Sequence, residues 1–140
     1  SAASDVYKRQ DISSESVKFA RKEIKKLLNT RCFISQGNVM NLPYEKGTFD
    51  LITAFETVYF WGNLQKTFNE VHRVLKNGGL FLICCEASDP SDETWTSRID
   101  GMVVHSAQDL ESCLARCGFS NITTHRRNKE NICVIAQKIQ

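Results

Sequence analysis

The chain has 140 residues, a net charge of +2, and 41% hydrophobic and 24% charged residues, which is ordinary for one soluble globular domain. No segment approaches the roughly 18 apolar residues of a membrane-spanning helix, and the N-terminus lacks the pattern of a signal peptide. We therefore expect a cytoplasmic protein that does not bind membranes. The basic residues are scattered, and the densest cluster, at 21–26, fits the solvated face of a helix, so we expect no nucleic-acid partner.

The cysteines do not follow the Cys-x-x-Cys spacing of zinc sites. They are Cys32, Cys84, Cys85, Cys113, Cys117 and Cys133. We interpret them as reduced, small hydrophobic residues, with a disulfide framework or a zinc site as the alternative. Neither His72 nor His105 has a second ligand at metal spacing, so we predict no metal.

The first third of the chain predicts a helix and a strand after an irregular start. Residues 1–10 have neither helical periodicity nor an apolar run, and we assign them to a non-native or disordered leader, with the domain at 11–140. Residues 13–29 carry apolar side chains at helical spacing, behind Ser13 or Ser14 as the cap. Residues 31–36 follow as a short strand that ends at Gly37.

The middle of the chain predicts strand, helix and strand. Residues 49–55 are almost continuously apolar and indicate a buried strand. Residues 63–76 show helical spacing and are ended by Asn77-Gly78-Gly79. Residues 80–85 form the most hydrophobic run, which is typical of a parallel strand buried on both faces.

The last third predicts a polar loop or short helix over 89–100, a helix over 106–117, and strands over 119–125 and 132–137. The short link between the last two strands indicates a hairpin, so one of them runs antiparallel. Strands that alternate with helices predict an α/β fold with a mostly parallel sheet and a C-terminal antiparallel hairpin. The predicted order opens on a helix, and no Gly-x-Gly-x-Gly turn occurs in the sequence.

The stretch from Gly37 to Trp61 predicts the wall of a ligand pocket. In open α/β sheets, ligands bind at the carboxyl ends of the strands. Two predicted strands end in this stretch, one near Asn38 and the other near residues 55–57.

Five segments together resemble the class I methyltransferases that depend on S-adenosylmethionine, in particular those of the type 11 group that act on small molecules. They are residues 11–13, 37–43, 49–52, 70–79 and 106–119. The run Glu-Val-His-Arg-Val-Leu-Lys-Asn-Gly-Gly at 70–79 is similar to the family's Glu-x-x-Arg-Val-Leu-Lys-Pro-Gly-Gly. The resemblance covers about residues 11–138 and implies a Rossmann-like fold. It also implies transfer of a methyl group from S-adenosylmethionine to an unidentified, small-molecule acceptor.

The resemblance also implies residues on the adenosine side of the cofactor. Asp11 matches the acidic residue that holds the ribose hydroxyls, with Ile12 beside it. Asn38 stands where the family usually has Asp, and its carbonyl oxygen can accept the same bond from the adenine amino group, with Val39 packing on the ring. From the residue alone, a helix cap or a partner of the helix dipole is the favoured role of Asp11, and Asn38 also suits a turn.

Residues after the strand at 49–55 match the methyl and acceptor side of the family's site, and Phe55 and Thr57 are the cofactor-binding candidates there. Tyr59 and Trp61 either line the pocket or form an aromatic cluster that seats the next helix. We assign no catalytic base, because methyl transfer from a sulfonium to a good nucleophile requires mainly in-line positioning.

The absent glycine turn sets this sequence apart from the family. We expect the chain to lack the family's first strand and glycine-rich loop, and to be an impaired fragment that binds the cofactor weakly or not at all. The alternatives are a catalytically inert interaction module and a nucleotide-dependent or NAD-dependent Rossmann enzyme. The oligomeric state does not follow from the sequence.

Overall fold

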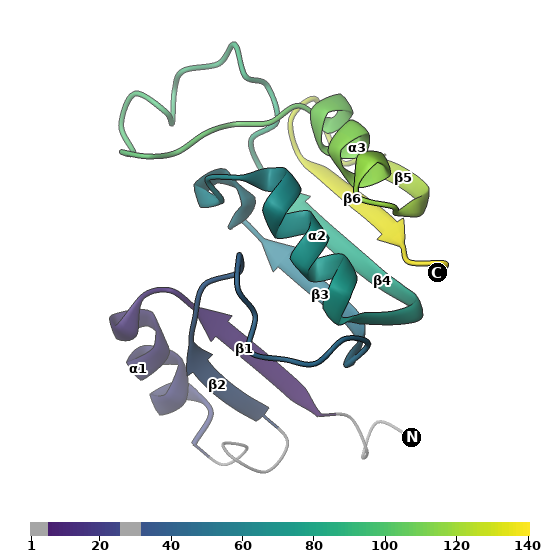
Figure 1. Ribbon diagram of the computed structural model, residues 1–140. Helices are drawn as coiled ribbons and strands as arrows, with labels where there is room; N and C mark the ends of the chain where they lie inside the picture. The colour runs from purple at the N-terminus through teal and green to yellow at the C-terminus, as the bar shows by residue number, and fades with distance from the viewer. Residues whose placement is uncertain (1–5, 26–31) are drawn as a thin grey trace. The chain divides into compact units, whose positions relative to one another are not determined.

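The computed structural model describes residues 6–25 and 32–140, and the chain divides into two compact units, residues 1–43 and 44–140. The helices and strands are shown in Figure 1. They are β1 (Tyr7–Asp11), α1 (Ser14–Glu23), β2 (Cys32–Gln36), β3 (Phe49–Phe55), the 3-10 turn η2 (Val58–Phe60), α2 (Leu64–Val74), β4 (Leu75–Cys85), α3 (Ala107–Arg116), β5 (Ser120–Arg126) and β6 (Ile132–Gln137).

The first unit is a β1–α1–β2 arrangement in which the two strands pair in parallel, with Tyr7 opposite Cys32 and Asp11 opposite Gln36. Ser13 caps the helix, because its hydroxyl accepts a hydrogen bond from the Ser16 amide at 3.2 Å. The apolar side of α1 packs Val17 and Ala20 against Ile34 of β2.

Two sequence predictions in this unit are corrected. Residues 7–10, which the sequence assigns to a leader, lie in β1, so the chain does not open on a helix. The sequence of β1 carries no apolar alternation, and its extended backbone depends on pairing with β2. Helix α1 ends at Glu23, before a turn at Ile24, because short helices propagate only as far as packing supports them. Residues 1–5, 26–29 and 31 of these predictions lie outside the described residues.

The second unit is built on a four-stranded sheet in the order β3-β4-β6-β5. Strands β3 and β4 are parallel, whereas β6 runs antiparallel to both of its neighbours. This confirms the predicted α/β fold with a mostly parallel sheet and a C-terminal antiparallel hairpin. The side chain of Asn128 shapes the hairpin link by accepting the amides of Glu130 and Asn131 at 2.9 and 2.8 Å.

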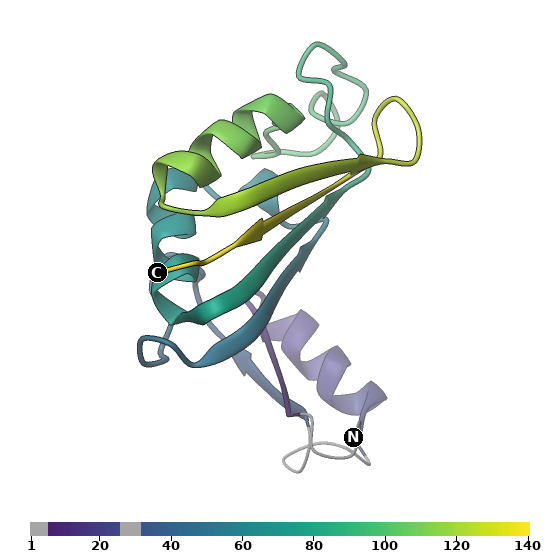
Figure 2. The same cartoon turned by 90° about the vertical axis from the view of Figure 1, so that its right-hand side faces the viewer.

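Helices α2 and α3 cover one face of this sheet, as Figure 2 shows. Their apolar stripes meet the strand residues that point toward them, and the largest side chains with no exposed surface include Phe68, Phe81, Leu110 and Leu114. Both helices begin where the sequence predicts, and side chains cap them: Asn63 accepts the Lys66 amide and Ser106 accepts the Asp109 amide. Local sequence therefore places both helices, and burial of their stripes holds them on the sheet.

The junction of α2 with β4 differs from the prediction. The helix ends at Val74, and β4 begins at Leu75 and runs through the Asn-Gly-Gly segment that was expected to be a terminator. Gly79 fits here because a Cβ atom would lie 2.8 Å from the Lys76 carbonyl oxygen and 3.2 Å from that of Asp50. Gly79 thus allows a close backbone approach within the strand.

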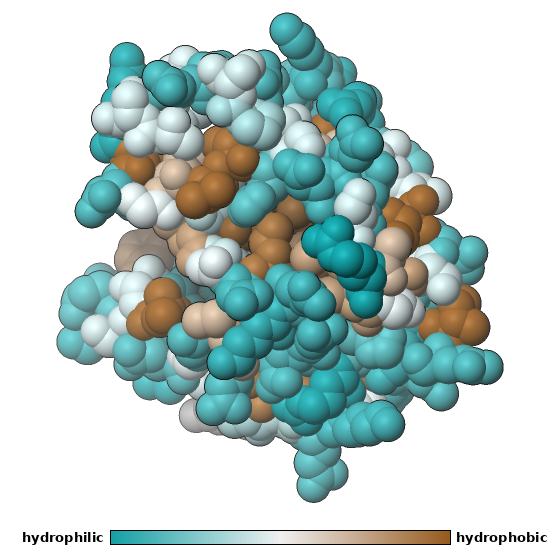
Figure 3. Space-filling view, turned by 45° about the horizontal axis from the view of Figure 1, so that its top comes forward, coloured by the Kyte–Doolittle hydropathy of each residue, from teal (hydrophilic) through white to brown (hydrophobic). Residues whose placement is uncertain are grey.

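The sheet face opposite to α2 and α3 carries exposed apolar side chains. Leu51, Phe55 and Leu80 are 54%, 60% and 39% exposed. Hydrophobic side chains reach the molecular surface in separate patches among polar ones in the space-filling view (Figure 3). Among the described residues, no helix has the length and apolarity needed to cross a bilayer.

Candidate functional site

The carboxyl end of β3 is joined to that of β4 through Glu56. The Glu56 amide donates to the Cys84 carbonyl at 2.9 Å, which extends the parallel pairing by one residue. The Glu56 carboxylate then accepts the Glu86 amide at 2.6 Å and the Tyr59 hydroxyl at 2.8 Å. The backbone of Glu56 has a φ of 55°, which is unusual for a residue other than glycine and turns the chain sharply into η2.

Tyr59 completes this network from inside the fold. Its ring is buried, and its hydroxyl accepts the Ala87 amide at 3.1 Å while it donates to Glu56. Burial raises the pKa of Tyr59 well above its usual range, and burial together with the Glu56 carboxylate raises the pKa of Cys85 to about 12. Both groups are therefore protonated at neutral pH, and Tyr59 is a hydrogen-bonding bridge rather than a base.

Replacing Tyr59 by phenylalanine is expected to lower the free energy of unfolding by about 1–3 kcal/mol, because the buried Ala87 amide loses its acceptor. Urea denaturation followed by circular dichroism measures the change. Tyr7→Phe is the control, since this ring is 55% exposed, and it should leave stability unchanged. Equal stabilities of Tyr59→Phe and the parent chain would show that the bridge contributes nothing.

An open pocket of about 550 Å³ lies at this end of the four-stranded sheet. The acids Glu56 and Glu86 lie at the ends of β3 and β4, and His125, Arg126 and Arg127 line the pocket from the β5–β6 hairpin. The wall thus combines both signs of charge with apolar surface, which suits a polar organic molecule better than a simple ion. In residues 6–25 and 32–140, no three His, Cys, Asp or Glu side chains are arranged to hold a metal ion.

Within the first unit, the candidates Asp11 and Asn38 lie at the same edge, because β1 and β2 are parallel and end together. The Oδ1 atom of Asp11 accepts the Ser13 amide at 2.9 Å, and the Asp11 carbonyl accepts the Gly37 amide at 2.9 Å. Ile12 is 68% exposed beside it. The edge therefore offers a carboxylate and an apolar side chain close to solvent.

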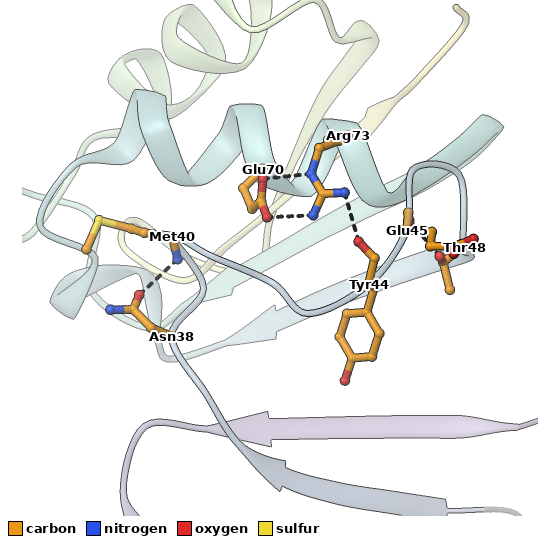
Figure 4. Close-up of polar contacts among 7 residues, drawn as sticks. All are labelled: Asn38, Met40, Tyr44, Glu45, Thr48, Glu70 and Arg73. Carbon is orange, nitrogen blue, oxygen red and sulfur yellow. Dashed lines mark hydrogen bonds and ion pairs between the residues drawn. The ribbon is translucent and has the colours of Figure 1, made fainter.

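Asn38 begins a tight turn, and its side chain folds back to the backbone of Met40 (Figure 4). Its Oδ1 atom accepts the Met40 amide at 2.9 Å, while the side chain stays exposed and Val39 is half-buried. The turn considered for Asn38 is thus present, whereas α1 is capped by Ser13 and the Asp11 side chain instead accepts the amide of that cap residue. These hydrogen bonds leave both side chains able to accept further ones, because a carboxylate has a second oxygen and an amide carbonyl oxygen has two lone pairs.

In the second unit, the candidates Phe55 and Thr57 are exposed on either side of Glu56. Trp61 instead is half-buried and packs against two core rings, with ring centroids 6.3 Å from Phe68 and 6.4 Å from Phe81. Of the two roles considered, Trp61 thus has the aromatic cluster that seats α2, whereas the Tyr59 ring contacts Phe60 and its hydroxyl bonds Glu56 and the Ala87 amide.

His72 and His105 are both partly buried. His72 is half-buried, with its ring 5.1 Å from that of Phe119, and burial together with Lys138 lowers its pKa. His105 is also half-buried, and burial lowers its pKa too.

The Glu-x-x-Arg motif has a structural role that sequence reasoning missed (Figure 4). Arg73 donates to both carboxylate oxygens of Glu70, at 2.9 and 2.7 Å, and to the carbonyl of Tyr44 at 2.8 Å. The Gly47 amide also donates to the Arg73 carbonyl. The motif therefore fixes the segment before β3 on the last turns of α2. The sequence signal for this role was the three-residue spacing between the opposite charges of Glu70 and Arg73.

Comparison with known proteins gives a consistent assignment. A family described as "Methyltransferase domain" matches residues 4–83. Demethylmenaquinone methyltransferase of Lactococcus lactis is 33% identical over 81 residues, which are 58% of this chain and 32% of that protein. Sterol 4-C-methyltransferase of Caenorhabditis elegans is 36% identical over 56 residues, which are 40% of this chain and 17% of that protein.

Solved structures show the same fold at low sequence identity. A methyltransferase of Thermotoga maritima, described as a possible histamine N-methyltransferase, has a TM-score of 0.75 and 18% identity, and the match covers 94% of this chain and 72% of that one. Geranyl diphosphate methyltransferase, solved in complex with S-adenosylmethionine, has a TM-score of 0.77 and 16% identity, with 96% and 69% covered. By contrast, the matches to the first three curated relatives span 32%, 21% and 34% of their lengths.

Proposed function

This chain belongs to the methyltransferase domain family, in the class I group that depends on S-adenosylmethionine, and from this premise we propose that it contributes to methyl transfer onto a small molecule. The observation that carries the proposal is that the family match at residues 4–83 contains all six cofactor-binding candidates. They are Asp11, Ile12, Asn38, Val39, Phe55 and Thr57.

The adenosine part of the cofactor is assigned to the edge of the first unit. Asp11 accepts hydrogen bonds from the ribose hydroxyls through its carboxylate, beside the exposed side chain of Ile12. Asn38 accepts from the adenine amino group, and Val39 contacts the ring. This assignment is supported by the polar acceptors that the parallel strands bring to one edge.

The methyl and acceptor side is assigned to the exposed residues Phe55 and Thr57. When bound, the cofactor supplies a methyl group already activated by its sulfonium. The protein's task is then to hold the acceptor in line with it and to exclude water. The Glu56–Tyr59 network keeps the β3 end fixed for that purpose.

The acceptor is proposed to be an apolar small molecule rather than a nucleic acid, and the enzyme to act in the cytoplasm. Phe60, Trp95, Ile99 and Val103 follow β3 and β4 in the chain and are 53%, 50%, 39% and 54% exposed. The Val103 amide donates to the Tyr59 carbonyl, so this apolar segment is attached directly to η2. The named relatives, demethylmenaquinone and sterol methyltransferases, support the same class of acceptor.

A finer part of the proposal is that these 140 residues bind the cofactor weakly. The residues present suit the adenosine part, but no Gly-x-Gly-x-Gly turn occurs in the sequence to approach the rest of the cofactor with its backbone. We expect a dissociation constant on the order of 1 mM, which corresponds to about −4 kcal/mol.

Titration of the ¹⁵N-labelled chain with S-adenosylhomocysteine tests both parts. Amide signals of residues 11–12 and 38–39 are expected to shift at millimolar ligand, and Asp11→Ala and Asn38→Ala should each weaken the response several-fold. Asp50→Ala is the control, because this exposed acid lies at the amino end of β3.

Three outcomes would contradict the proposal in different ways. Low-micromolar binding would refute the weak-binding part alone. A response to NAD in place of S-adenosylhomocysteine would indicate a nucleotide-dependent enzyme. A folded chain that responds to neither ligand would favour a non-catalytic interaction module.

A further inference from the structure

Two thiols face each other across the antiparallel pair β4–β6. Cys84 and Cys133 are direct partners in the register although they lie 49 residues apart in the chain. The Cys84 thiol donates to the Cys133 sulfur over 3.3 Å. Both are free and half-buried, and both line the pocket at the carboxyl end of β4. A small oxidant that enters this pocket therefore meets the two sulfurs together.

The strand geometry allows these sulfurs to bond. Opposite residues in antiparallel strands have Cα atoms about 4.5–5.5 Å apart, within the roughly 4.4–6.8 Å that a disulfide spans. The sulfurs must approach from 3.3 Å to about 2.0 Å, which side-chain rotation and a small strand movement can provide.

The other described cysteines are placed less favourably for bonding with either partner. Cys85 is buried on the opposite face of β4, since neighbours on a strand point to opposite sides. Cys113 and Cys117 are buried on the second unit's helix side, where the Cys117 thiol donates to the Gln65 carbonyl.

We propose that Cys84 and Cys133 form a reversible disulfide when the protein meets a hydroperoxide. The sulfur of one thiolate attacks the peroxide, the O–O bond breaks, and an alcohol or water leaves. The sulfur of the second cysteine then attacks the resulting sulfenic acid, and the S–S bond forms as water leaves. The two thiols together lose two protons and two electrons, and the hydroperoxide is reduced by those two electrons.

Two properties make this bond a slow but reversible modification. Cross-strand Cβ atoms lie about 4.5–5.5 Å apart, more than the roughly 3.8 Å that a relaxed disulfide prefers, so the bond is strained and easily reduced. Burial and the neighbouring Cys133 raise the pKa of Cys84 to about 11, so its thiolate is scarce at neutral pH and oxidation accelerates as pH rises. The bond would tie β4 to β6 beneath the pocket. Formation of this disulfide does not depend on methyl transfer.

Peptide mapping tests the proposal on the whole chain. After treatment with hydrogen peroxide and alkylation of the remaining thiols, trypsin should release residues 77–98 joined to residues 130–138, at the summed mass less two hydrogens. Dithiothreitol should separate them. The joined peptide should form on the order of tenfold faster in the native chain than in the urea-unfolded chain, because the fold holds the thiols together.

Variants identify the partners, since residues 77–98 contain Cys84 and Cys85. Cys85→Ser should keep the joined peptide, whereas Cys84→Ser and Cys133→Ser should each abolish it. The Cys113→Ser/Cys117→Ser pair is a second control that should keep it. The proposal is overturned if the native chain gives only sulfenic or sulfinic acids, if the link survives Cys84→Ser, or if native and unfolded chains link at equal rates.

Discussion

Phe81→Ala is expected to lower the free energy of unfolding by about 3–5 kcal/mol, the usual cost of removing a buried aromatic ring. Phe81 has no exposed surface, and its ring centroid lies 5.5 Å from that of Phe68 and 5.9 Å from that of Phe119. It points from the centre of the sheet toward α2 and α3, so its loss leaves a cavity in the main core of the second unit. Urea denaturation followed by circular dichroism measures the change.

The matched control is Leu80→Ala, one residue earlier on the same strand. Leu80 points to the opposite face and is 39% exposed, so we expect a loss below about 1 kcal/mol. If Phe81→Ala does not fold, Phe81→Leu tests the same prediction, with an expected loss of about 1–2 kcal/mol in the free energy of unfolding. Equal losses at positions 80 and 81 would mean that the helix-covered face is not the core.

Lys138→Met is expected to lower the free energy of unfolding by about 2–4 kcal/mol, because it removes a charged donor from two backbone carbonyls. Lys138 is only 3% exposed, and its Nζ atom donates to the His72 carbonyl at 2.8 Å and to the Leu75 carbonyl at 2.9 Å. These carbonyls belong to the C-terminal end of α2, where a positive charge is also favoured by the helix dipole. Burial lowers the pKa of Lys138, so desolvation offsets part of this gain.

Lys76→Met is the control for Lys138. Lys76 lies near the same junction, but its side chain is 50% exposed and pairs with Asp50 only at 3.4 Å, so we expect a change below about 1 kcal/mol. Chemical denaturation of both variants at one pH gives the comparison. Similar losses for the two variants would show that the buried amino group does not cap α2.

The elements predicted with correct bounds are those with strong local patterns. The strands Phe49–Phe55 and Ile132–Gln137 occur as predicted, because each is an apolar run between polar or glycine-containing segments. Helices α2 and α3 begin at the predicted positions, with Asn63 and Ser106 as their caps. Capping and periodicity depend on residues within one turn of each other, so they can be recognised in the sequence.

The candidate site was predicted only in part. Position in the chain and family resemblance were enough to place Asp11 and Asn38 at neighbouring strand ends. Neither could indicate that Asp11 binds the Ser13 amide and Asn38 the Met40 amide. The sequence assigned no role to Glu56, whose carboxylate accepts the Glu86 amide, 30 residues away.

By itself, the sequence determined the α/β fold, the order of most elements and the family, since these follow from local periodicity and short motifs. Only the tertiary structure decided that residues 7–10 form a strand, that Lys138 is buried and that Cys84 faces Cys133. The physical reason is the same in all three cases. Pairing between strands and capping by distant side chains join residues far apart in the chain, and such contacts leave no periodic signal in the sequence.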